Sequence, residues 1–372
     1  MLVWGSAAGR RRARQVGALL AITALPAMAQ DAPSQIRAEI QRLQRSLKDQ
    51  PLAMQGMPSA NSDTERDLKS ALDALDAGHL YVGLETLLRV EDFLQGARFA
   101  AERGAEIKKG GMPAFQATWD KQSLELTAFH REFQAASWSH APAAVRALAE
   151  AAATRVTPLL EGGLGFATAT GPQDGVFYLG EAQGEAQFAR LCARLPLRRK
   201  GAPLPLRSLL PELESLQAKT NAAYQPPRSV ELHPRFIALN STLKMAQELD
   251  AAQLYAGALY EYLEATRHYG MLAMAPLADA GKAALKKDMA AARQKLDTAK
   301  DDNSVALIFL ERAEAQTAHP DGSPASADEW RSARVIVDQV LPAYFAARKP
   351  ASPLRQVAGN TVNITLVRWP YT

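Results

Sequence analysis

The sequence predicts an all-α protein, arranged as a helical bundle or an array of αα-hairpins in two lobes. Apolar residues recur every three or four positions through most of the chain, which is the period of a helix with one buried face. Helix-start signals, such as the capping boxes Ser62 to Glu65 and Ser326 to Glu329, precede some of these stretches. The composition, 47% hydrophobic and 22% charged over 372 residues, is typical of a folded chain with a large core.

Residues 1–29 are predicted to be a secretory signal peptide. Four arginines precede an apolar run over residues 16–25, and Ala27 and Ala29 fit the small-residue pattern of a cleavage site. The run is too short to cross roughly 30 Å of hydrocarbon as a helix. We therefore expect cleavage near Ala29, a periplasmic or secreted protein, and no stable membrane span after cleavage. An uncleaved anchor helix is the alternative interpretation.

The charge balance argues against nucleic acid as a partner. The chain has 43 lysines and arginines against 39 aspartates and glutamates, and the four arginines of residues 1–29 account for the whole excess. The remaining chain is neutral, whereas nucleic-acid binding usually requires a basic surface.

Residues 30–195 are expected to form the first helical lobe. Its apolar stripes at helical spacing are Ile36, Ile40, Leu43 and Leu47; Leu68, Leu72 and Leu75; Leu80, Leu84, Leu87 and Leu94; Leu126, Phe129 and Phe133; and Val145, Leu148, Ala152, Val156 and Leu159. Two features interrupt this pattern. Gly162, Gly163 and Gly165 predict the end of a helix and a turn. Residues 175–180, where apolar residues stand between glycines, predict a short extended segment.

Cys192 is the only cysteine of the chain, so no intramolecular disulfide can form. It lies at helical spacing with Phe188, Leu191 and Leu195, which predicts a buried and unreactive thiol. The fold must therefore be stabilised by packing.

Residues 196–207 are predicted to connect the lobes, because the stretch is rich in prolines and basic residues that exclude a regular helix. Residues 208–350 are expected to form the second helical lobe, and residues 351–372 an extended tail in which residues 361–368 alternate apolar and polar side chains. The stripes of the second lobe are Leu209, Leu213 and Leu216; Phe236, Leu239 and Leu243; Leu285, Met289, Ala292 and Leu296; and Trp330, Ala333, Val337 and Leu341.

The two lobes share sequence features that suggest an internal repeat. Residues 75–83 (LDAGHLYVG) and 249–257 (LDAAQLYAG) agree at six of nine positions. This pattern resembles the turn and second-helix start of tetratricopeptide-type hairpins, which implies an αα-hairpin at each position. The 34-residue period of that family is missing, so no binding residues follow from the resemblance. Chance similarity between helices rich in alanine and leucine is the alternative.

Three tyrosines are the candidate binding residues. Tyr255, Tyr262 and Tyr269 recur every seven residues, so they share one face of a predicted helix and could line a groove with their rings and hydroxyls. This pattern favours an exported binding or scaffolding protein whose partner is an unknown envelope protein or peptide. Core packing is the alternative explanation of the stripe.

A second hypothesis is a periplasmic enzyme or metal binder. Glu261, Glu264 and His268 lie on the same predicted helix at spacings that could bring their side chains together. A solvated polar face is the alternative interpretation. Motifs for haem attachment, zinc proteases, serine hydrolases and phosphate-binding loops are missing from the sequence, so no cofactor is expected. A structural envelope protein without a pocket is a third interpretation.

Overall fold

The computed structural model describes residues 31–52, 59–226, 230–275, 277–319 and 323–349, and it confirms the all-α fold. The first half contains α1 (Ala32–Asp49), α2 (Ala60–Asp76), α3 (Leu80–Ala135), α4 (Ala143–Ala169) and α5 (Pro172–Arg194). The second half contains α6 (Leu210–Ala223), a 3-10 turn η1 (Val230–Leu232), α7 (His233–Ala251), α8 (Tyr255–Ala273), α9 (Asp279–Asp297), α10 (Ser304–Thr317), α11 (Ala327–Val335), a π-helix η2 (Ile336–Val340) and α12 (Leu341–Ala347).

The predictions for residues 1–29 and for the tail 351–372, with its extended segment 361–368, lie outside the described residues. Across the described ranges, none of the helices has the length and hydropathy needed to cross a membrane. The same ranges contain no β-strand, and a single bridge joins Ala202 to Asp301.

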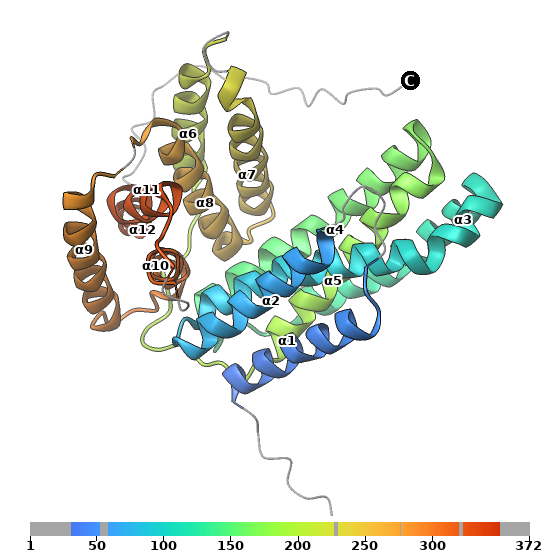
Figure 1. The fold of residues 1–372 in the computed structure, drawn as a ribbon, viewed down its shortest axis with the longest axis horizontal. Coiled ribbons are helices and arrows are strands. Elements are labelled where there is room, and N and C mark those ends of the chain that lie inside the picture. The colour runs from blue at the N-terminus through green and yellow to red at the C-terminus, as the bar shows by residue number, and fades with distance from the viewer. Residues whose placement is uncertain (1–30, 53–58, 227–229, 276, 320–322, 350–372) are drawn as a thin grey trace, which may run out of the picture.

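Figure 1 shows the two halves beside each other. Helices α1 to α5 lie alongside one another as a bundle, and α6 to α12 gather on the other side. Helix α3 changes direction at Gly111, whose φ of 62° lies in the left-handed region that favours glycine.

The predicted apolar stripes form the core of the first half. Ile36, Ile40, Leu43 and Leu47 are buried on α1, and so is Cys192 on α5, as the sequence predicts. Burial raises the pKa of the Cys192 thiol well above its usual value.

Helices α3 and α5 cross very closely because α5 carries glycines at the crossing. A Cβ atom on Gly180 would lie 2.5 Å from the carbonyl oxygen of Gln95, and one on Gly184 would lie 2.6 Å from the Cα atom of Asp92. No larger residue fits without moving one backbone away from the other.

The prediction of an extended segment at residues 175–180 is wrong, because these residues lie inside α5. Val176 and Leu179 are buried one helical turn apart, and the flanking glycines serve close packing instead of ending the element. The turn predicted at Gly162 to Gly165 is wrong for the same reason. These glycines lie inside α4, where a Cβ atom on Gly163 would lie 2.9 Å from the carbonyl oxygen of Gly175.

The two predicted capping boxes have different outcomes. The box at the start of α11 is confirmed, because the Ser326 hydroxyl accepts from the Glu329 amide (3.2 Å) and the Glu329 carboxylate accepts from the Ser326 amide (2.6 Å). The box at Ser62 is wrong, because α2 already begins at Ala60 and the Ser62 hydroxyl donates to the Ser59 carbonyl (2.9 Å).

Both copies of the repeated sequence form αα-hairpins, as the resemblance implies. Helix α2 turns into α3 through Gly78, with φ of 80°, and α7 turns into α8 through Gln253, with φ of 61°. The same hydrogen bond closes each turn, from the His79 amide to the Ala74 carbonyl (2.8 Å) and from the Leu254 amide to the Leu249 carbonyl (2.9 Å). The duplication itself stays a prediction.

Carboxylates of each half cap a helix of the other half. Glu311 on α10 accepts hydrogen bonds from the amides of Tyr81 and Val82 at the start of α3 (2.8 and 3.1 Å). Glu150 on α4 accepts one from the Gly257 amide at the start of α8 (2.7 Å). These amides have no partner within their own helices, so each half supplies hydrogen-bond acceptors to a helix start of the other half.

Candidate functional site

Two of the three candidate tyrosines line a groove in the second half. Tyr262 and Tyr269 on α8 are half-buried and form one wall of a cavity of about 470 Å³. Thr266 of α8 lies between them, and the remaining residues come from α6, η2 and α12. Those that matter for recognition are Glu212, Ser215, Lys219 and Gln339. Tyr255, the first residue of α8, is half-buried as well but does not line this groove.

The helix geometry of α8 sets the spacing of the two tyrosines. Seven residues separate Tyr262 from Tyr269, which is almost two turns and a rise of about 10.5 Å along the helix axis. Both rings therefore reach the same groove at two levels.

The π-helix η2 closes the groove against α8. Gly270 allows this approach, since a Cβ atom there would lie 2.5 Å from Cγ1 of Val335 and 2.7 Å from Oε1 of Gln339. Gln339 belongs to η2 and lines the groove beside the tyrosines. Single π-helical turns are frequent at functional sites, because the extra residue redirects side chains.

Helix α6 runs parallel to α8, because α7 is antiparallel to both. Gln217 in the middle of α6 donates to Asn240 on α7 (3.1 Å), and Ser208 before α6 donates to Asp250 at the end of α7 (2.7 Å). A tight turn then joins α7 to α8. Along the groove, Glu212 therefore lies toward the level of Tyr262.

The two ends of the groove differ in charge. Glu212 is neutralised by Arg207, whose guanidinium also donates to the carbonyl of Lys349 (3.0 Å). Burial raises the pKa of Tyr262, and Glu212 adds to this rise while Arg207 opposes it. At the other end Lys219 is exposed and makes no ion pair among the described residues. One end is thus neutral and the other carries a positive charge.

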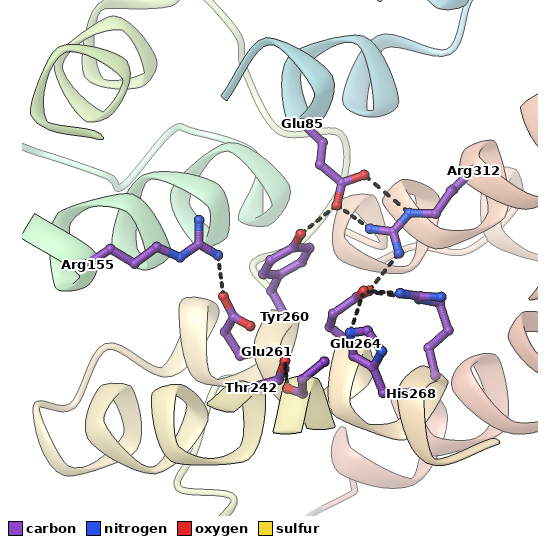
Figure 2. Close-up of polar contacts among 10 residues, drawn as sticks. Glu85, Arg155, Thr242, Tyr260, Glu261, Glu264, His268 and Arg312 are labelled. Carbon is purple, nitrogen blue, oxygen red and sulfur yellow. Dashed lines mark hydrogen bonds and ion pairs between the residues drawn. The ribbon is translucent and has the colours of Figure 1, made fainter. Parts of the chain in front are cut away.

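The structure separates Glu261 from the other two residues of the metal-binder hypothesis. The Glu261 carboxylate meets Arg155 (2.8 Å), whereas Glu264 binds Arg312 (2.6 Å) and lies 3.4 Å from His268 (Figure 2). The part of the chain that the structure describes contains no group of three or more His, Cys, Asp or Glu side chains that could hold a metal.

The surroundings of these three residues determine their protonation. Burial raises the pKa of Glu261 despite the nearby Arg155. Burial acts the same way on Glu264, but Arg312 and Arg267 outweigh it and hold the pKa of this carboxyl below its usual range. Burial also lowers the pKa of His268. Figure 2 shows Glu264 facing Arg312 and Tyr260 pointing to Glu85, so these polar groups face one another inside the protein.

Sequence reasoning missed the α6 wall of the groove and the half-buried arginines Arg155 and Arg312. Arg312 and Glu311 follow the apolar run from Val305 to Leu310, and single charges at the end of such a run were the available signal. The α6 wall gave no such signal, because its exposed residues look like any solvated helix face.

A scan against known protein families, a search of curated proteins and a search of solved structures found no match for this chain.

Proposed function

We propose that this protein is an exported helical binding protein that holds a peptide or a segment of an envelope protein in the groove between α6, α8 and η2. The observation that supports it is the pairing of Tyr262 with Tyr269 on one wall of a groove whose other walls mix apolar residues with Glu212, Ser215, Lys219 and Gln339. Tyrosines combine a flat apolar face with a hydroxyl and are enriched at binding surfaces.

A second, smaller groove of about 280 Å³ between α3 and α5 is the weaker candidate. Phe129 and Phe133 line it, but the Arg190 guanidinium lies over the Phe129 ring at 5.1 Å and pairs with Glu132 (2.8 Å). The Phe129 ring and the Arg190 cation of this groove are therefore already engaged with each other.

Export of the protein is part of the same proposal. It rests on the arginines, apolar run and small residues of positions 1–29. Processing of the chain at Ala29 in a secreting host, measured by N-terminal sequencing or intact mass, tests this part. A full-length product retained in the cytoplasm would contradict it.

Selection from a library of random twelve-residue peptides tests the binding function. We expect the wild-type protein and Tyr255→Ala to enrich the same peptides, and Tyr262→Ala and Tyr269→Ala to lose them. Tyr255 is the matched control because it lies on the same helix outside the groove. Enrichment that is equal in all four proteins would contradict the assignment of the groove.

A further inference from the structure

We infer that the groove recognises a proline-rich segment in the polyproline II conformation that carries an acidic residue at the Lys219 end. This inference rests on the proposed function and names its ligand class. It depends on the spacing of two tyrosines, on the hydrogen-bonding groups of the groove and on the order of its charges.

The spacing of the tyrosines matches the repeat of a polyproline II helix. Tyr262 and Tyr269 are separated by about 10.5 Å along α8. A polyproline II helix has three residues per turn and rises about 3.1 Å per residue, so prolines three positions apart are about 9.3 Å apart. Each proline ring of such a pair can therefore rest on one tyrosine ring, as in other aromatic grooves that bind this conformation.

The polar groups of the groove complement a ligand that mostly accepts hydrogen bonds. Proline has no amide hydrogen, and a polyproline II helix leaves its carbonyl groups free. Four of the residues that line the groove carry hydrogen-bond donors, namely Tyr262, Tyr269, Gln339 and Lys219. Its single carboxylate, Glu212, is occupied by Arg207.

The order of charges gives the ligand a direction. Lys219 lies seven residues after Glu212 on α6, and α6 runs parallel to α8. Lys219 therefore lies at the level of Tyr269, while the neutral pair lies at the level of Tyr262. An aspartate or glutamate next to the proline on Tyr269 would meet the ammonium, whereas a lysine there would be repelled.

Fluorescence anisotropy with three labelled peptides tests the inference. The probe consists of ten prolines followed by two aspartates. The second peptide ends in two lysines, and the third replaces the prolines by glycine and serine but keeps the aspartates. We expect the probe to bind more tightly than either of the others, with an affinity that falls as salt increases.

Variants locate the binding. Tyr262→Ala and Tyr269→Ala are each expected to weaken probe binding about tenfold, as truncation of an aromatic anchor commonly does. Tyr255→Ala should leave it unchanged within about twofold. Ser215 is exposed and lies one helical turn before Lys219. The carboxylate introduced by Ser215→Glu therefore neutralises the Lys219 ammonium without disturbing the core. This variant should weaken binding of the probe about threefold and should not weaken binding of the lysine-ended peptide.

Three outcomes would overturn the inference, and they separate it from the proposed function. If the glycine and serine peptide binds as tightly with the same tyrosine dependence, the groove binds peptides but not polyproline II helices. If none of the three peptides binds but chitohexaose does so through Tyr262 and Tyr269, the groove is a carbohydrate site and the proposed peptide binding fails as well. If no ligand depends on these tyrosines, both the inference and the proposed function fail.

Discussion

Gly78 and Gln253 are the left-handed residues of the two hairpin turns, but only Gly78 is a glycine, and in the aligned repeat it stands opposite Ala252. A side chain in this region costs on the order of 1 kcal/mol, because its Cβ atom crowds the following carbonyl oxygen. A Cβ atom on Gly78 would have nothing within 4 Å, so the cost there comes from the backbone alone.

We expect Gly78→Ala to lower the free energy of unfolding by about 1 kcal/mol and Gln253→Gly to raise it by a few tenths to about 1 kcal/mol. Urea denaturation followed by circular dichroism measures both. Gln253→Ala keeps a Cβ atom in the strained position and should change little. A loss of stability in Gln253→Gly would show that the Gln253 side chain makes a contact that outweighs the strain.

Residue patterns predicted one wall of the candidate site but not the whole of it. The seven-residue repeat of Tyr262 and Tyr269 identified a helix face, since periodicity is a local property of the sequence. It also included Tyr255, because a sequence pattern does not show where along α8 the neighbouring helix α6 begins. The facing residues Lys219 and Gln339 come from distant segments, so only the fold brings them to the tyrosines.

Glycines inside helices explain where element prediction from the sequence fails. A glycine can end a helix, break a strand or allow two helices to touch, and the residues beside it do not distinguish these roles. At Gly175 and Gly180 the third role applies. Helices with long apolar stripes and no internal glycine, such as α1, were predicted at their observed positions.

The close approach of α3 and α5 leads to a prediction about glycine substitutions, and a second glycine of the same protein serves as the control. We expect Gly184→Ala to lower the free energy of unfolding by about 1 to 3 kcal/mol, because its Cβ atom would overlap Asp92. Gly165→Ala in α4 has open space around the new Cβ atom and should raise stability by about 0.5 to 1 kcal/mol through helix propensity. Thermal and urea unfolding measure both variants. Equal effects at the two positions would contradict the close crossing.

The two halves depend on each other through buried ion pairs. Arg155 on α4 binds Glu185 on α5 (3.3 Å) and Glu261 on α8 (2.8 Å), and Arg312 on α10 binds Glu264 on α8 and Glu85 on α3. Removing one partner of a buried pair leaves a buried charge without compensation, which is costly. We therefore expect the two halves to unfold together in one cooperative transition.

Replacing Arg155 tests whether the two halves unfold together. We expect Arg155→Met to lower the free energy of unfolding by about 1 to 3 kcal/mol, because the buried side chains of Glu185 and Glu261 lose the hydrogen-bond donor that they share. Arg37→Met removes a surface pair with Asp76 and should cost less than about 1 kcal/mol. Urea unfolding, followed by tryptophan fluorescence and by circular dichroism, should show one transition for each protein. Two separate transitions would contradict the dependence of one half on the other.

The contribution of Glu181 and Glu185 to the stability of the protein should fall as the pH rises from about 5 to about 8. Burial raises the pKa of Glu181 to about 7, with Asp92 adding to the rise, and raises the pKa of Glu185 to about 8 although Arg155 opposes it. The folded state therefore holds these protons more tightly than the unfolded chain, whose glutamates titrate near 4.3. This stabilisation is complete below that value and is lost as the pH rises through the folded pKa.

Glu181→Gln isolates one of these groups. The glutamine resembles the protonated acid, so the variant should match the wild type at pH 5 and have a higher Tm than the wild type at pH 8. Asp92 from α3 and Glu185 one turn along α5 keep the remaining dependence on pH, since both stay in place. Glu65→Gln, at an exposed position on α2, is the control and should follow the wild type at every pH. A Tm for Glu181→Gln that falls as steeply as that of the wild type would show that the proton on this side chain does not stabilise the fold.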